Sequence, residues 1–140
     1  MDCLFCQIAG GEKPATVVFE DQQTLAFLDH RPLFHGHCLL IPKQHFETLS
    51  DLPLEFIKPL FENVQLLSRG VEQAMGAQGT FVAMNNRVSQ SVPHLHVHIV
   101  PRRKGDGLKG FFWPRTKYAS QTEMEQVRDL IQAELTRLKK

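Results

Sequence analysis

The stretch Val92-Pro-His-Leu-His-Val-His-Ile-Val-Pro101 alternates polar and apolar residues. Side chains point to alternate faces along a strand, so this pattern predicts a strand over residues 92–101 with histidines on one face. The histidine face carries His94, His96 and His98, spaced about 6.6–7 Å apart by strand rise. The apolar face carries Leu95, Val97 and Ile99, which we expect to pack beneath a helix.

Three imidazoles on one face bury no apolar surface, so packing does not account for them. One interpretation is a metal site, because paired histidines at this spacing bind an ion. Another is nucleophilic catalysis, because a neutral imidazole, with an ordinary pKa of about 6.5, attacks phosphorus and carries a nucleotidyl group covalently. A plain surface role is the third. The residues alone leave the three open.

Outward from this strand, the sequence predicts a single α+β domain over residues 1–140. A short helical turn over residues 3–9 comes first. Runs rich in β-branched and aromatic residues predict four more strands, at 16–20, 24–29, 36–41 and 80–84. Their order favours an antiparallel sheet over βαβ units.

A long helix is predicted between the third and fourth strands. Ser50 or Asp51 would cap it, with Pro53 tolerated in its first turn. Pro59 is expected to bend the helix or to mark a later start. The buried stripe comprises Ile57, Leu60, Phe61, Val64, Leu67, Val71 and Met75. A last helix is expected over about 120–137, with the stripe Val127, Leu130, Ile131, Leu135 and Leu138.

The composition is that of an ordinary globular chain of 140 residues, 42% hydrophobic and 22% charged, which argues against disorder. Sixteen Lys+Arg against 15 Asp+Glu leave a net charge of +1, without the basic excess of a protein that binds nucleic acid polymers. No apolar run approaches the roughly 18 residues that span a bilayer, so we expect no membrane partner. The sequence starts without a signal-peptide pattern, and three cysteines make no disulfide framework, so we expect a cytoplasmic protein.

The segment Gln90-Ser-Val-Pro-His-Leu-His-Val-His-Ile-Val-Pro-Arg102 strongly resembles the signature of the histidine triad (HIT) family of nucleotide hydrolases and transferases. Nearly the whole chain shares the family's motifs in order, at Cys3-Leu-Phe-Cys6, Phe27-Leu-Asp29, Gly36-His37 and Leu39-Leu-Ile-Pro-Lys43. The resemblance implies a HIT fold: a five-stranded antiparallel sheet with a long central helix and a C-terminal helix. It also implies a homodimer whose two sheets join.

The resemblance assigns the chemistry to His96, the middle histidine. This residue would attack the α-phosphate and form a nucleotidyl-histidine, which water would hydrolyse to release AMP. Phosphate and leaving-group contacts are implied for His98, Gln90, Ser91 and one asparagine, Asn85 or Asn86. The chain departs from many members here, because its loop Asn86-Arg-Val-Ser-Gln90 is shorter and lacks a glycine before the glutamine. This departure puts the leaving-group side in question.

The nucleoside side of the site follows from the same resemblance. Asp29 matches the position that binds the ribose hydroxyls, and a carboxylate can accept hydrogen bonds from both hydroxyls of a cis-diol. The base slot is implied for Phe5, Ile8 and Phe27, each of which could equally belong to the core. His37 is expected near the triad as a supporting residue, or as a merely structural histidine.

Cys3 and Cys6 form a Cys-x-x-Cys pair, which alone fits a redox dithiol, half of a metal site or two small apolar residues. Family members with this opening bind zinc with two further histidines, which correspond to His45 and His94. Such a closed Cys2His2 site would be structural. Cys38 is expected in the core.

The sequence thus predicts a HIT-type enzyme that cleaves the α-phosphate linkage of an adenine nucleotide. A nucleotidyl or phosphoryl transferase, or a non-catalytic zinc-stabilised module that binds nucleotides, is the alternative. The segment over residues 104–118 either shapes specificity or the dimer, or forms a solvated loop followed by a packed aromatic patch.

Overall fold

The computed structural model describes residues 2–108 and 115–139. Phe111, Phe112 and Trp113, the aromatic part of the 104–118 segment, lie outside the described residues. The chain divides into two compact units, Met1–Asp106 and Gly107–Lys140, and each is described by itself. The single domain over residues 1–140 stays a prediction. No helix among the described residues is long and apolar enough to cross a membrane.

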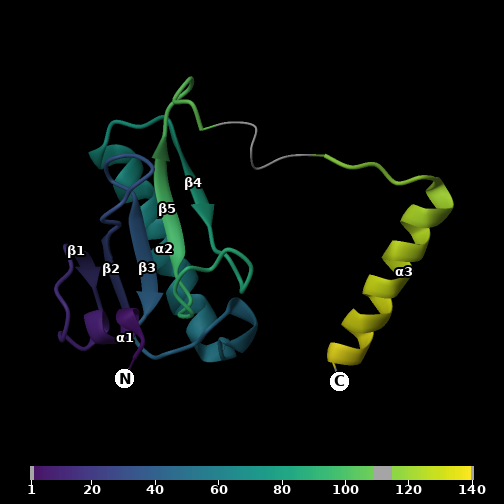
Figure 1. The fold of residues 1–140 in the computed structure, drawn as a ribbon, viewed down its shortest axis with the longest axis horizontal. Helices are drawn as coiled ribbons and strands as arrows, with labels where there is room; N and C mark the ends of the chain where they lie inside the picture. Colours follow the sequence, from purple (N-terminus) through teal and green to yellow (C-terminus); the bar gives the residue numbers. More distant parts are fainter. Residues whose placement is uncertain (1, 109–114, 140) are drawn as a thin grey trace. The chain divides into compact units, whose positions relative to one another are not determined.

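The first unit is built on a five-stranded antiparallel sheet, as the sequence predicts (Figure 1). Along the chain the strands are β1 (Val17–Glu20), β2 (Thr24–Leu28), β3 (Cys38–Pro42), β4 (Gly79–Ala83) and β5 (Val97–Arg102). Their order across the sheet is β1-β2-β3-β5-β4. The last strand is therefore inserted between β3 and β4, and β4 forms an edge.

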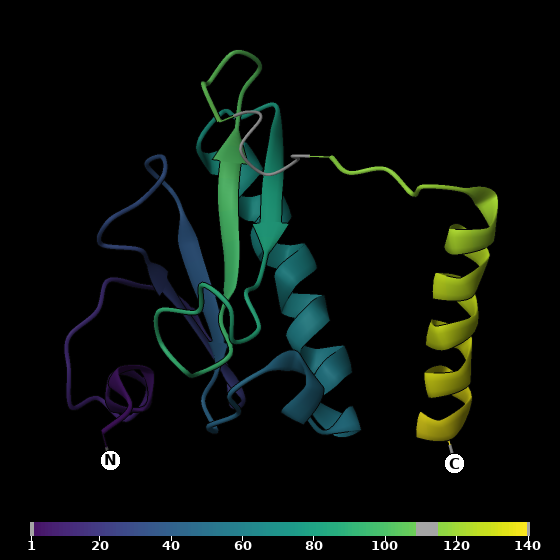
Figure 2. The same cartoon turned by 45° about the vertical axis from the view of Figure 1, so that its right-hand side comes forward.

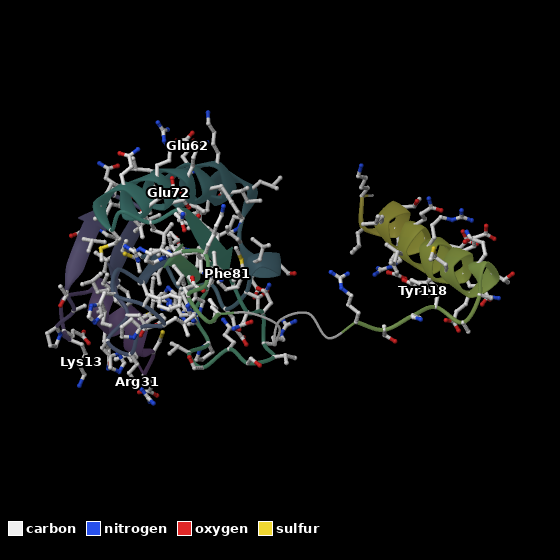
Figure 3. The ribbon with its side chains drawn as sticks, turned by 90° about the horizontal axis from the view of Figure 1, so that it is seen from above. Lys13, Arg31, Glu62, Glu72, Phe81 and Tyr118 are labelled. Atoms are coloured by element: carbon white, nitrogen blue, oxygen red, sulfur yellow. The ribbon has the colours of Figure 1, made fainter. Side chains whose placement is uncertain are left out.

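Helix α2 (Leu54–Ala74) covers one face of this sheet (Figures 1 and 2). Its buried residues Leu60, Val64, Leu67 and Val71 form one cluster with Leu95, Val97 and Ile99, all three of which are fully buried. The expected pairing of the apolar face with a helix is therefore observed. Glu62 lies on the side of α2 away from the sheet (Figure 3).

Two details of the predicted long helix are wrong. Ser50 and Asp51 do not cap it, because they belong to a 3-10 helix, η1 (Leu49–Asp51), which is closed by a capping box between Thr48 and Asp51. Pro53 is the N-cap of α2 instead of a residue of its first turn. Pro59 lies inside the helix, which excludes the later start, and the expected bend stays a prediction. A proline at the N-cap loses little, since the first four N–H groups of a helix have no intrahelical partner.

The opposite face of the sheet packs against the short helix α1 (Leu4–Ala9). Alternation along β2 and β3 sends Leu25, Phe27, Leu39 and Ile41 to this face, where they cluster with Phe5 of α1. His98 pairs with Leu39 across β3 and β5, so it lies on the α1 face as well. The second unit contains α3 (Gln121–Leu138), which begins after Ser120, whose side chain accepts the N–H of Glu123.

The histidine segment differs from the predicted strand in its first half. Strand β5 begins at Val97, so His94 and His96 precede it rather than belong to it. The N–H of Leu95 donates to the carbonyl of Phe46, and the N–H of His94 donates to the carbonyl of Val92. Loop contacts therefore replace the sheet ladder before Val97, and the two histidines lie outside that ladder.

Candidate active site and metal centre

His96 is almost fully buried, and its protonation is decided by the main chain. Its Nδ1 lies 2.7 Å from the carbonyl oxygen of His94. A carbonyl oxygen only accepts, so the Nδ1–H of His96 donates and the proton sits on Nδ1. Nε2 of His96 consequently carries the lone pair. In this tautomer the ring is a nucleophile at Nε2.

His98 is given the opposite tautomer by a chain of hydrogen bonds. The N–H of Leu33 donates to Nδ1 of His37 over 3.1 Å, so Nδ1 of His37 carries a lone pair and its proton sits on Nε2. That Nε2–H donates to Nδ1 of His98 over 3.0 Å. In neutral His98 the proton is thereby placed on Nε2, where it can serve as a donor. The rings of His96 and His98 are 5.1 Å apart between centroids.

Burial keeps His37 and His98, the two rings of this hydrogen-bond chain, neutral. Burial, followed by the neighbouring His96 and His37, lowers the pKa of His98 to about 4, and Asp29 opposes the change. Burial also lowers the pKa of His37, again against Asp29, whose Oδ2 lies 3.6 Å from Nε2 of His37. Near pH 7 both rings are neutral, which agrees with the tautomers assigned from the hydrogen bonds.

Asp29 follows β2 and is held by two main-chain contacts. Its Oδ1 accepts the N–H of Arg31 over 2.9 Å, and its own N–H donates to the carbonyl of His37. It borders a hollow of about 610 Å³ between α1 and the sheet, lined by Leu4, Ile8, Pro14, Ala15, Thr16, Phe27, Leu28, Asp29 and His30. The structure therefore brings together three of the predicted nucleoside contacts: Ile8, Phe27 and Asp29.

Phe5 is placed differently from the other predicted slot residues. It is buried, contacts Phe27 with ring centroids 5.4 Å apart, and stands perpendicular to His96 at 5.1 Å. It therefore supports the wall of the hollow and the position of His96. Sequence reasoning missed Leu4 and the turn residues Pro14 to Thr16, because small residues between a helix and a strand carry no periodic signal.

The segment before the triad is braced by its own polar side chains. Both ends of the Gln90 amide are used: Oε1 accepts the N–H of Arg87, and Nε2 donates to the carbonyl of Glu47. Asn86 accepts the N–H of Leu49 over 2.8 Å, whereas Asn85 makes a longer bond, of 3.3 Å, to the carbonyl of Ser89. Of the two asparagines, Asn85 is thus the less committed. Ser91 is exposed, and its phosphate role stays a prediction together with those of Asn85 and Gln90.

The four predicted metal ligands meet at one point beside α1. Sγ of Cys3, Sγ of Cys6, Nδ1 of His45 and Nδ1 of His94 all lie within 4.8 Å of one another. His94 Nδ1 is 3.4 Å from Sγ of Cys3, 3.5 Å from Sγ of Cys6 and 3.2 Å from Nδ1 of His45, and Sγ of Cys6 is 3.3 Å from Nδ1 of His45. Tetrahedral zinc, at about 2.3 Å from sulfur and 2.0–2.1 Å from nitrogen, separates its ligand atoms by about 3.3–3.8 Å.

The tautomer of His94 also suits a cation. Its Nε2–H donates to the carbonyl of Pro42 over 2.8 Å, so its lone pair is on Nδ1 and faces the two thiols. Burial, followed by the hydrogen bond to Cys3 and repulsion from it, raises the pKa of the Cys6 thiol to about 11. Thiolates at this point therefore need a positive charge to stabilise them. The residues present fit a structural zinc ion in donor type, number and spacing.

A second group of possible ligands, Asp29, His37 and His98, also lies within 4.8 Å. Here Nδ1 of His37 already accepts the N–H of Leu33, which leaves the proton of the neutral ring on Nε2. The atoms that face one another are a donor and an acceptor, joined over 3.0 Å. This group is therefore better described as a hydrogen-bond chain than as a metal site.

Comparison with known proteins identifies the family. A family model described as "HIT domain" matches residues 10–105. Adenylylsulfatase HINT3 of Arabidopsis thaliana is 38% identical over 109 residues, 76% of this chain and 55% of the relative. Adenosine 5'-monophosphoramidase of Schizosaccharomyces pombe is 35% identical over 116 residues, 81% of this chain and 84% of the relative. The chain therefore belongs to the histidine triad family.

Solved structures agree with this assignment. The crystal structure of a Streptococcus mutans UA159 protein has a TM-score of 0.86 and 34% identity, and the match covers 96% of this chain and 85% of that one. A Zn-bound histidine triad family protein from Mycobacterium smegmatis has a TM-score of 0.73 and 34% identity, covering 97% of this chain and 98% of that one. The antiparallel sheet and its helices are thus the HIT fold.

Proposed function

We propose that this protein hydrolyses an adenine nucleotide at its α-phosphate linkage through a nucleotidyl-His96 and releases AMP. The observation that carries the proposal is the tautomer of His96, whose Nδ1–H is bound by the carbonyl of His94, leaving the Nε2 lone pair available for attack. The names of two relatives, an adenylylsulfatase and an adenosine 5'-monophosphoramidase, support the choice of AMP as product.

The reaction proceeds in two displacements. Nε2 of His96 forms a bond to the α-phosphorus, and the bond from phosphorus to the leaving group breaks. Water then attacks the same phosphorus, the nitrogen–phosphorus bond breaks, and AMP leaves. His98 donates its Nε2–H to a phosphate or leaving-group oxygen, with His37 holding that donor in place. Most of the work is positioning and charge stabilisation, as in other phosphoryl transfers.

The nucleoside occupies the hollow between α1 and the sheet. Asp29 accepts hydrogen bonds from the ribose hydroxyls, and Ile8 and Phe27 contact the base. Asn85, Gln90 and Ser91 are assigned to the phosphate and leaving-group side. The hollow's volume of about 610 Å³ and its mostly apolar lining with one carboxylate at the edge support this assignment.

Zinc bound by Cys3, Cys6, His45 and His94 has a structural role in this proposal. When present, the ion supplies positive charge that stabilises the two thiolates. The ligands come from the N-terminal segment, the loop after β3 and the segment before β5. The site therefore fixes the start of α1 beside the nucleotide hollow.

We assign the protein to the cytoplasm and to a homodimer that joins two sheets. None of the three cysteines forms a disulfide among the described residues, which suits a reducing compartment. Strand β4 is an edge of the sheet, and Val82 on it is 40% exposed, which supports pairing with a second copy.

A substrate panel tests the function. Adenosine phosphoramidate, adenosine phosphosulfate and dinucleoside polyphosphates are incubated with the protein and scored for AMP. Release of AMP from any of them, dependent on His96, supports the hydrolase. A nucleotidylated or phosphorylated second substrate would identify a transferase instead. Nucleotide binding without any turnover across the panel would overturn the enzymatic assignment in favour of a zinc-stabilised binding module.

A further inference from the structure

Helix α3 carries an apolar stripe that the described residues of its own unit do not cover. Its members recur at helical spacing along one side: Met124, Val127, Ile131, Leu135 and Leu138. Val127 is half-buried and the others are exposed, Leu138 by 67%. Residues 115–120, which lead into the helix, are themselves exposed. Most of the stability of a helix in a protein comes from packing of its apolar face, so this stripe calls for an apolar partner.

The stripe is symmetric about Ile131. Met124 and Leu138 lie seven residues before and after it, and Val127 and Leu135 lie four residues before and after it. If two α3 helices run antiparallel with their Ile131 side chains facing, Met124 of one helix meets Leu138 of the other, and Val127 meets Leu135. A two-fold axis at Ile131 repeats each of these pairs, as an isologous contact requires.

The charges on α3 favour the same antiparallel arrangement. Residues 121–129 carry Glu123, Glu125 and Asp129 against Arg128, which is 1 − 3 = −2. Residues 131–139 carry Arg137 and Lys139 against Glu134, which is 2 − 1 = +1. Antiparallel helices place the acidic half of one against the basic half of the other, whereas a parallel pair in register places like against like. A membrane-surface helix would instead be basic throughout its polar face.

We propose that α3 is a self-association helix, which pairs antiparallel with α3 of a second copy of this chain about Ile131. The contact uses none of the residues assigned to nucleotide or zinc. It is also separate from the β4 edge, so it adds a second surface through which copies of the chain meet.

Disulfide trapping in the full-length chain tests the pairing. Ile131→Cys places two thiols across the two-fold axis, where they should give about tenfold more cross-linked dimer than the wild type, because facing Cβ atoms come within the roughly 3.5–4.5 Å that a disulfide needs. Met124→Cys alone should stay at the wild-type level, since 14 residues of helix separate its two copies by about 21 Å. Met124→Cys combined with Leu138→Cys should cross-link like Ile131→Cys.

Leu130→Cys is the matched control. Leu130 belongs to the stripe expected from the sequence, but it lies about 100° around the helix from Ile131, and it is 70% exposed. Cross-linking of Ile131→Cys and the double variant, with Leu130→Cys and Met124→Cys at the wild-type level, supports the proposal. Equal cross-linking of the single variants Met124→Cys and Ile131→Cys would show a parallel pair and overturn it. Ile131→Cys at the wild-type level would overturn it too, and would mean that the stripe is covered by something other than a second α3.

Discussion

Two main-chain groups, the N–H of Leu33 and the carbonyl of His94, decide where the protons sit on the site's imidazoles. The first acts through His37 and leaves His98 with a donor at Nε2, and the second leaves His96 with a lone pair at Nε2. The same ring type thus presents a donor at one position and a lone pair at the next. The family resemblance separates the roles of His96 and His98, but the sequence does not indicate their tautomers, because main-chain partners leave no trace in residue identity.

His96→Ala should abolish AMP release while nucleotide affinity stays within about tenfold, because the ring makes its decisive bond only during the reaction. Steady-state turnover and equilibrium binding check the two parts. His35→Ala is the control, since His35 is an exposed histidine on a loop, and it should turn over at the wild-type rate. More than about a tenth of the wild-type rate in His96→Ala would contradict covalent catalysis by this residue.

Folding stability should fall as the pH is lowered from about 6.5 toward 4, in part through His98. The pKa of this ring is about 4 when folded and near its ordinary 6.5 when unfolded, so the unfolded chain binds more protons within that window. Urea unfolding at pH 7 and pH 5 measures the loss. His98→Asn keeps an acceptor for His37 but does not titrate, so it should lose less stability between the two pH values than the wild type.

At the scale of elements, the sequence predicts the presence of each strand and helix more accurately than it predicts their first residues. Strand β5 starts five residues later than expected, because the alternation from Val92 continues through residues whose hydrogen bonds go to loops. Alternation reports which side chains are buried, and Leu95 is buried although it lies outside the ladder. Pairing partners, which decide strand ends, are distant in sequence.

Helix α1 is short and depends on its neighbours, so losing the metal ligands should affect stability first. Purified protein should contain about one zinc per chain, and replacing Cys3 and Cys6 by Ser should remove it and lower the melting temperature. Turnover per folded molecule should change much less. Cys38→Ser is the control, because this buried thiol lies apart from the ligand cluster and its loss should leave the zinc content unchanged. Full zinc content in the Cys3/Cys6 double variant would refute the ligand assignment.

At the scale of the whole molecule, the hollow proposed for the nucleotide draws on three regions: α1, the turn before β1 and the end of β2. The motifs identify Ile8, Phe27 and Asp29 one at a time, and the family pattern places them in one site. What the sequence does not supply is the turn that closes the hollow, because Pro14, Ala15 and Thr16 become significant only once the sheet has formed.

Pairing of the β4 edges should give a particle of twice 16.0 kDa in sedimentation experiments. The measurement belongs in an Ile131→Glu background, so that pairing of α3 does not contribute to the mass. Adding Val82→Lys to this background should reduce the particle to one chain, since a charge on an edge strand opposes strand pairing. Val88→Lys, on an exposed loop, is the control and should leave the mass doubled. A single-chain mass before Val82 is changed would contradict the sheet-edge dimer.

His94 takes part in two sites through different atoms: its ring faces the thiols, and its carbonyl holds the Nδ1–H of His96. Every residue type has that carbonyl. During evolution a descendant could therefore exchange His94, together with Cys3, Cys6 and His45, for residues that stabilise α1 without metal, and still present the same nucleophile. Metal dependence and catalytic chemistry are then separately inherited traits in this fold, and a homologue that lacks the four ligands need not have lost its activity.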